Sequence, residues 1–200
     1  ATTGEAAGTA IGVAYNTGTN THTPNPQQQT KPSKENVSWL QLGIKDQRYI
    51  PLNHDTTLGT YIEGFYSSRN LDPNYTATML QAGAFSPTPS TIFTYNPTFR
   101  ANQYIAAGLK PIYTITSYLQ LRLEAYAFLP ISPIYCDEAG KAHYGKPLST
   151  MEHIEELSLV GRFSTFVLSA YLNHNSSSPG NINAGLSLGW YMMNNRFIEQ

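Results

Sequence analysis

The stretch YLQLRLEAYAFLP, residues 118–130, carries the strongest structural signal in this sequence. Leucine or alanine occupies every second position from Leu119 to Leu129. The positions between them hold a second set: Gln120, Arg122, Glu124, Tyr126 and Phe128. An alternation with period two places the two sets on opposite faces of a β-strand. The stretch therefore predicts a strand with one apolar face and one face that carries Arg122 and Glu124.

Seven other segments repeat this alternation, the last of them as regularly as residues 118–130: 9–16, 37–49, 57–67, 103–115, 154–161, 163–173 and 181–193. The sequence predicts an all-β chain of about eight strands and no helix. Several strands reach the roughly 9 to 11 residues that a tilted strand needs to cross a bilayer. Strands in globular proteins are most often about five or six residues long.

The linkers between these segments alternate between long and short. Residues 17–36, 68–102, 131–153 and 173–181 form the long linkers, and tight turns fall near residues 53–54, 116–117 and 162. In an antiparallel up-and-down sheet this places all long loops at one end, as in outer-membrane β-barrels. We therefore expect a single domain over residues 1–200, built as a transmembrane β-barrel portion.

The composition agrees with this expectation and excludes some other functions. Charged residues make up 12% of the chain, against about 25% in an ordinary soluble domain. The 12 basic residues balance 13 acidic ones, so we expect no nucleic-acid partner. If the leucine face of residues 118–130 contacts lipid, Arg122 and Glu124 face a lumen, where they can pair or tune a channel.

Tyrosines lie on or at the ends of the expected strands, where outer-membrane barrels place aromatic girdles. The set is Tyr15, Tyr49, Tyr61, Tyr66, Tyr104, Tyr113, Tyr118, Tyr126, Tyr171 and Tyr191.

The segment GLSLG, residues 185–189, matches the G-x-S-x-G pattern of lipases and esterases. A nucleophile elbow needs a strand, a sharp turn and a helix, with the acid and the histidine following the serine. Ser187 lies within an alternating strand, and every aspartate and histidine precedes it. We expect Ser187 to be a small lumen-side residue and this chain to have no catalytic site.

Two segments offer metal-ligating side chains: CDEAGKAHYG, which begins at Cys136, and MEHIEE, which contains Glu152, His153 and Glu156. Neither has the spacing of a known metal motif. We expect solvated loop charge there, no metal site and no cofactor.

Several segments resemble the bacterial surface antigen barrel of the outer-membrane assembly and translocation superfamily. They are GAFSPTPST (83–91), NPTFRANQYIAAGLKPIY (96–113), LQLRLEAYAFLP (119–130) and GLSLGWYMMNNRFIEQ (185–200). The closest similarity is to the barrel that ends outer-membrane patatin-like phospholipases.

The resemblance implies that the chain is the C-terminal half of a barrel of roughly sixteen strands. It implies that residues 68–102 fold into the lumen and that Arg100 anchors them there, although the valine and glycine of the family's V-R-G-aromatic motif are absent. It also implies a location in the bacterial outer membrane, contact with its lipid and with the barrel assembly machinery, and an upstream lipase domain that this chain anchors, translocates or displays.

Two other interpretations fit the same alternation. A complete small barrel acting as an adhesin or binding module would pair residues 9–16 with residues 181–193. A soluble secreted β-sandwich that binds glycans would bury Leu121, Leu123, Leu186 and Leu188 in its core.

Overall fold

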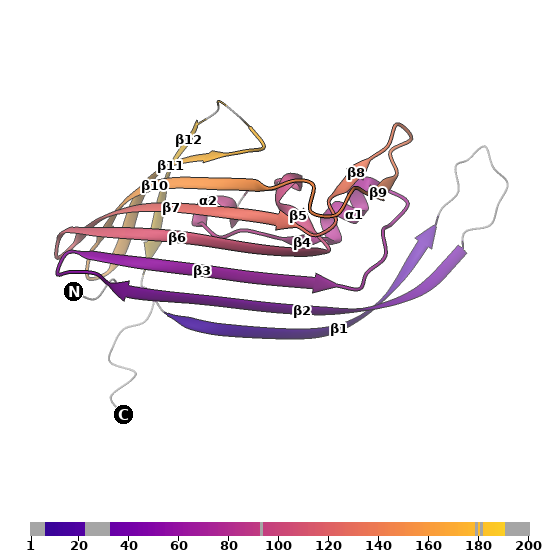
Figure 1. Ribbon diagram of the computed structural model, residues 1–200, viewed down its shortest axis with the longest axis horizontal. Coiled ribbons are helices and arrows are strands. Elements are labelled where there is room, and N and C mark those ends of the chain that lie inside the picture. The colour runs from indigo at the N-terminus through magenta and orange to yellow at the C-terminus, as the bar shows by residue number, and fades with distance from the viewer. Residues whose placement is uncertain (1–6, 23–32, 93, 179, 181, 191–200) are drawn as a thin grey trace.

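A computed structural model describes residues 7–22, 33–92, 94–178, 180 and 182–190. Its main element is one antiparallel sheet of eight strands in the order β1-β2-β3-β6-β7-β10-β11-β12. The strands are β1 Gly8–His22, β2 Ser33–Pro51, β3 Thr56–Ser67, β6 Gln103–Thr116, β7 Leu119–Pro130, β10 Glu152–Arg162, β11 Phe166–Asn175 and β12 Ile182–Trp190. Sequential strands are neighbours throughout, so the predicted all-β, up-and-down arrangement of eight strands is confirmed (Figure 1).

The strands are long, from 9 residues in β12 to 19 in β2. Short turns connect β2 to β3, β6 to β7 and β10 to β11, and the other connections are longer. β1 and β2 extend further than the sequence predicted. They occupy residues 17–22 and 33–36 of the expected loop 17–36, and the rest of that loop lies outside the described residues. The extension is possible because Thr17 to His22 find backbone partners in Ser33 to Ser38.

The long connection between β3 and β6 contains the elements that the sequence did not reveal. In order they are α1 Tyr75–Gln81, β4 Gly83–Ala84, α2 Pro89–Ile92, the 3₁₀ helix η1 Pro97–Phe99 and β5 Arg100–Ala101. The expectation of no helix was therefore wrong. The longest described helix, α1, was missed because seven residues are too few to show a helical period in the sequence. Its start is set by Asn74, whose side chain accepts a hydrogen bond from the amide of Ala77 at 3.0 Å.

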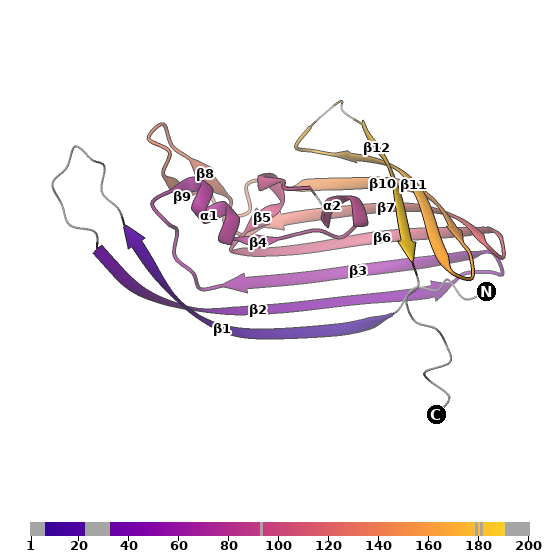
Figure 2. The ribbon, with the colours of Figure 1, turned by 180° about the vertical axis from the view of Figure 1, so that it is seen from behind.

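We call residues 68–102 the insertion. In two opposite views, α1, α2, β4 and β5 lie within the curve of the sheet, against its inner face (Figures 1 and 2). The connection between β7 and β10 forms a small separate hairpin, β8 Ile134–Cys136 with β9 Ala142–Tyr144.

The two faces of the sheet differ sharply in exposure. In β7, Gln120, Arg122, Glu124, Tyr126 and Phe128 are buried on the inner face beneath the insertion, as the alternation predicted. Leu121 and Leu123 lie exposed on the outer face, and so do Leu186 and Leu188 of β12. The sandwich interpretation, which required these four leucines to form a core, is therefore contradicted.

The sheet is open along its two edges. β1 and β12 are its outermost strands, and no pairing joins them to each other among the described residues. Residues 191–193 of the expected last strand fall outside those residues. The pairing that a complete eight-stranded barrel requires is thus missing from the described part of the chain.

The predicted aromatic positions divide between the faces. Tyr15, Tyr66, Tyr113 and Tyr118 are exposed on the outside or at a turn. Tyr61, Tyr104 and Tyr126 are buried on the inner face, so their assignment to a girdle was wrong, because their positions share the face of the inward polar residues. Tyr49 and Tyr171 also share inner-face positions, and Tyr191 lies outside the described residues.

Candidate functional site: the inner face and its insertion

An aromatic cluster fastens the insertion to the inner face of the sheet. Phe85 of the insertion stacks on Phe128 of β7 with ring centroids 5.4 Å apart, and Phe99 meets the same ring edge-on at 5.8 Å. Tyr104 of β6 lies 4.9 Å from Phe128 on the other side. All four rings are buried. Their apolar area and edge-to-face geometry hold the insertion in place.

The half-buried carboxylate of Glu63 lies beside this cluster and has partners on its own strand and on the neighbouring one. Glu63 of β3 accepts hydrogen bonds from the hydroxyls of Tyr61 and Tyr104, the latter at 2.6 Å. A carboxylate that receives two hydroxyl donors is well compensated for its loss of water. Glu63 is the one charged residue among the inward positions of β3. Its inward direction follows from the alternation, but the sequence analysis did not single it out.

Glu124 forms an ion pair on the inner face. Its Oε1 lies 3.2 Å from Nζ of Lys110 on β6, and its Oε2 accepts the Tyr126 hydroxyl at 2.6 Å. The side chains of Lys110 and Glu124 are only 11% and 3% exposed. The inward orientation predicted for Glu124 is therefore correct, and the structure supplies the cation that the sequence analysis missed.

A second carboxylate lies directly across from Glu124. Glu156 of β10 is its register partner and is also buried. Glu156 accepts hydrogen bonds from the Ser90 hydroxyl of the insertion and, at 3.3 Å, from the Asn173 amide of β11. These donors, together with Lys110 beside Glu124, allow two like charges to face the same interior.

Arg122 is likewise buried on the inner face, where one guanidinium nitrogen donates to the Gln120 side chain at 3.1 Å. The inner face thus concentrates charge in pairs and hydrogen bonds. It brings together two of the residues singled out from the sequence, Arg122 and Glu124, on adjacent inward positions of β7.

Arg100 occupies a different place, inside the insertion. Its Nη1 donates to the backbone carbonyls of Met79, Leu80 and Ala82, at 3.0, 3.2 and 3.2 Å. These carbonyls end α1, where helices leave acceptors unpaired and favour a cation. The structure therefore shows Arg100 joining β5 to α1.

Replacing Arg100 with alanine is expected to loosen α1. The loss of a charge-assisted donor to three carbonyls corresponds to about 1.5–3 kcal/mol of local stability. Hydrogen exchange of the peptide spanning residues 74–82 should speed up accordingly. Arg48→Ala, which removes a largely exposed partner of Asp46, is the control and should leave that peptide unchanged. Equal protection in both variants would contradict this role.

The helix that Arg100 caps is itself partly shielded from water. Thr78 and Met79 are buried, and Met79 packs in a small cluster with Ala82 and Ile134 of the β8–β9 hairpin. Burial, more than the nearby Tyr95 and Cys136, raises the pKa of the Tyr75 hydroxyl above its usual value. The insertion and the hairpin therefore form one packed unit at the long-loop end of the sheet.

Ser187 lies in the middle of β12, opposite Ser169 of β11. Gly185, two residues before Ser187, is a glycine for a structural reason. A Cβ at Gly185 would lie 2.3 Å from the hydroxyl oxygen of Tyr171. Because Tyr171 lies over this position, a larger residue could fit only if the ring moved. The strand predicted for GLSLG is confirmed, and its first glycine makes room for a neighbouring side chain.

The two segments with metal-ligating side chains adopt ordinary structures. Asp137 accepts hydrogen bonds from the amides of Ala139 and Lys141 at 2.9 and 2.7 Å, which closes the β8–β9 turn, and Gly140 there has a φ of 76°. Along β10, Glu152 and Glu156 share the inner face, while His153 and Glu155 occupy the alternate positions. The expectation of solvated loop charge was wrong for this segment, because it forms a strand and Glu156 is buried. Among the described residues no group of three or more His, Cys, Asp or Glu side chains is placed to hold a metal ion.

None of the helices in the described part of the chain has the length and apolar character of a transmembrane helix. Comparisons with protein families, characterised proteins and solved structures found no match to this chain.

Proposed function

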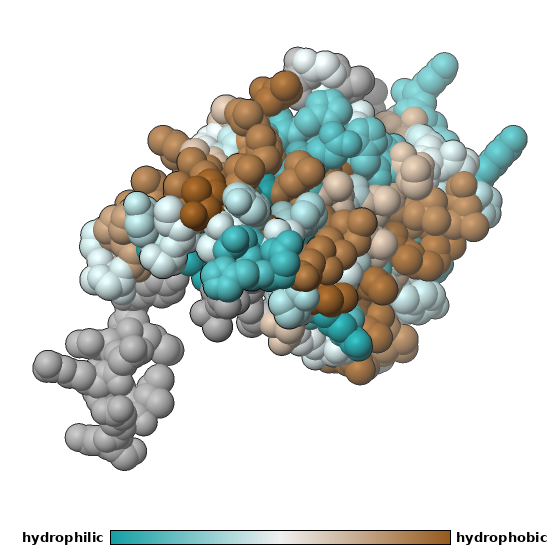
Figure 3. Space-filling view, turned by 60° about the vertical axis from the view of Figure 1, so that its left-hand side comes forward, coloured by the Kyte–Doolittle hydropathy of each residue, from teal (hydrophilic) through white to brown (hydrophobic). Residues whose placement is uncertain are grey.

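We propose that this chain forms about half of the wall of a larger β-barrel in a bacterial outer membrane. The observation that carries the proposal is the outer face, on which every one of the eight strands exposes large apolar side chains. Figure 3 shows one side of the molecule, where several apolar patches lie among polar ones. Representative residues, in strand order, are Val13, Ile44, Ile62, Leu109, Leu123, Leu159, Leu168 and Leu186. Soluble monomers rarely expose so extensive an apolar surface, whereas a lipid-facing barrel wall requires one.

The distribution of charge supports the same conclusion. Lys110, Arg122, Glu124 and Glu156 are all buried on the inner face. On the outer face of β3, β6 and β7 the described strands carry no charged residue, because their outward positions hold Leu, Ile, Ala, Thr, Tyr, Pro, Gly and Gln. Outward charges occur in β2, as Asp46 and Arg48, and in β10, as Glu155. A charge on the lipid side of a barrel costs several kcal/mol at mid-membrane, so this arrangement suits a bilayer better than water.

Aromatic rings at the short-turn end support a membrane interface there. Tyr118 and Phe163 lie in successive short turns with ring centroids 6.3 Å apart. Phe163 continues to Phe166 at 4.6 Å, and Phe166 to Trp190 at 6.0 Å. Such a row matches the aromatic girdles of membrane barrels.

The two open edges support a half barrel over a complete small one. In hydrocarbon every backbone amide and carbonyl needs a partner, so β1 and β12 must pair with further strands. We propose that these strands come from the preceding part of the same protein, as the resemblance implies. This chain then anchors an upstream patatin-like lipase domain, needs the barrel assembly machinery for insertion, and performs no catalysis itself.

The test is fractionation of the full-length protein from a Gram-negative host. We expect it in the outer-membrane fraction, resistant to carbonate extraction, and migrating faster in gels when it is not heated. A full-length protein that stays monomeric in buffer without detergent would overturn the proposal.

A further inference from the structure

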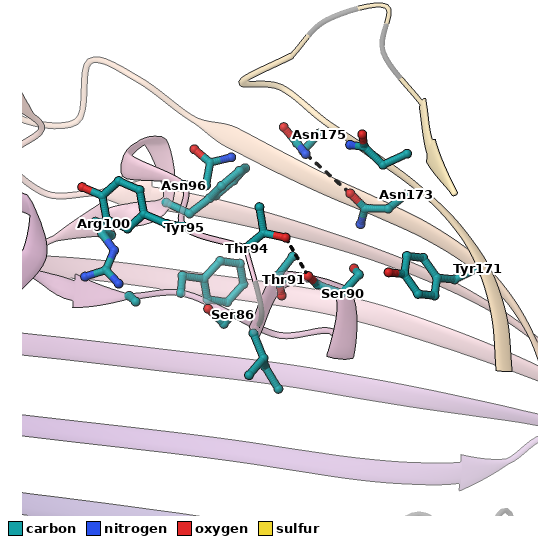
Figure 4. A pocket seen from close by; sticks show the side chains of 15 residues that line it. Ser86, Ser90, Thr91, Thr94, Tyr95, Asn96, Arg100, Tyr171, Asn173 and Asn175 are labelled. Atoms are coloured by element: carbon teal, nitrogen blue, oxygen red, sulfur yellow. Dashed lines mark hydrogen bonds between the residues drawn. The ribbon is translucent and has the colours of Figure 1, made fainter. Parts of the chain in front are cut away.

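A cleft of about 580 Å³ opens between the insertion and the last strands of the sheet. One wall is formed by the α2–η1 part of the insertion, and the other by inner-face side chains of β11 and β12 (Figure 4). Its volume falls within the range of roughly 300–1,000 Å³ that is usual for small-molecule sites. Phe85 and Phe99, which fasten the insertion to β7, also line this cleft, so its wall on that side is fixed by the aromatic cluster.

The lining of the cleft is almost uncharged and combines polar side chains with the apolar Ala84, Phe85, Ile92 and Phe99. Side-chain amides come from both walls, from Asn96 of the insertion and from Asn173, Asn175 and Asn183 of the sheet. Serine, threonine and tyrosine hydroxyls fill the positions between them, and no carboxylate is among the lining residues. Arg100 is the only cation in the lining, and its Nη1 already donates to the carbonyls of α1.

Several of these groups are held in position by bonds outside the cleft. The Asn96 amide donates to the Ser177 hydroxyl at 2.7 Å, which ties the two walls together. The Asn173 amide donates to the buried Glu156. Such second contacts fix the direction of an amide before a ligand arrives, which lowers the entropy cost of binding.

Other polar groups in the cleft keep hydrogen-bonding capacity for a ligand. Within the described ranges, the Tyr171 hydroxyl and the Asn183 amide form no hydrogen bond to another protein group. Tyr95, half exposed, presents an aromatic ring at the opposite wall. The cleft thus offers donors, acceptors and rings together.

We propose that this cleft binds a neutral oligosaccharide. Each sugar hydroxyl both donates and accepts, as amide and hydroxyl side chains also do, and the apolar faces of sugar rings pack on aromatic side chains. An anionic ligand is disfavoured, because buried Glu156 lies directly behind Asn173 and Ser90. An extended peptide would be held mainly by backbone bonds along a strand edge, whereas this lining consists of side chains. The inference does not depend on a membrane location.

The test uses the full-length protein in detergent, titrated by calorimetry with maltohexaose, chitohexaose and mannohexaose. We expect saturable binding of at least one of them. Tyr171→Phe and Asn183→Ala should each weaken it about tenfold, the loss expected when a hydrogen bond to a ligand is removed from a polar site. Ser187→Ala is the matched control on the same strand, outside the lining, and should leave the affinity unchanged.

Three results would overturn the proposal. They are no saturable binding of any neutral hexasaccharide, equal affinity in the Tyr171, Asn183 and Ser187 variants, and tighter binding of an oligogalacturonate or of a neutral Gly-Ser peptide than of the best neutral sugar. Because outer-membrane fractionation is measured separately, failure here leaves the proposed membrane function standing.

Discussion

Replacing Leu123 with arginine is expected to destabilise the full-length protein in phospholipid vesicles by about 2–4 kcal/mol, the cost of a basic residue on the lipid face near mid-membrane. Leu123 lies in the middle of β7, opposite Leu157 of β10, and is 50% exposed on the outer face. Its outer-face neighbours Leu121, Ala125 and Leu157 are apolar, and the carboxylate diagonal to it, Glu155, lies 3.8 Å from His174 of β11. Urea unfolding in vesicles, followed by tryptophan fluorescence, measures the loss.

The matched control is Leu148→Arg. Leu148 is similarly exposed, at 57%, but lies in the long connection that leads from the β8–β9 hairpin to β10, outside the sheet. Surface substitutions of this kind change stability by less than about 0.5 kcal/mol. If the outer face were in contact with water, both variants would unfold alike. That result would contradict the lipid-facing role of the wall.

Replacing Lys110 with methionine is expected to have a still larger effect, a loss of about 3–5 kcal/mol, because it leaves a buried carboxylate without its cation. Glu124 would keep the Tyr126 hydroxyl as a donor and would still face Glu156 across the strand pair. The interior around it is closed by the insertion and cannot supply water freely. The same vesicle-based unfolding measurement applies.

The double variant Lys110→Met with Glu124→Gln provides the control for this prediction. Glutamine keeps an oxygen for the Tyr126 hydroxyl but removes the unpaired charge, and neutral replacement of both members of a buried pair is often close to neutral in stability. We therefore expect most of the lost stability to return. A double variant as unstable as Lys110→Met alone would show that packing of the lysine stem, and not its charge, matters at this site.

The strands and their faces were predictable because the information is local. Within β7, six inward and six outward positions alternate without interruption, and each residue's side of the sheet follows from its neighbours two positions away. The same rule assigned Arg122 and Glu124 to the interior and Leu186 and Leu188 to the outside. If the rule had been applied to each tyrosine separately, it would have placed Tyr61, Tyr104 and Tyr126 on the inner face and not in the expected girdle.

The partners of these residues were not predictable, because they come from distant parts of the sequence. Arg100 bonds to carbonyls about twenty positions earlier, and Ser90 bonds to Glu156 across 66 residues. The short helix α1 was not predicted, for a related reason. Its stability depends on the Asn74 cap, the Arg100 guanidinium and packing against the hairpin, and not on a repeating pattern of its own.

The sequence by itself thus determined the eight strands of the main sheet, their up-and-down order, the end at which the short turns lie and the inward direction of Arg122 and Glu124. All of these follow from period-two alternation and from the lengths of the linkers, which are properties of adjacent residues. Only the tertiary structure decided that the insertion covers the inner face, that Lys110 pairs with Glu124, that the sheet stays open between β1 and β12, and that a polar cleft remains beside β11. Those features depend on contacts between side chains that are far apart in the sequence. The spacing of residues along a single strand does not specify such contacts.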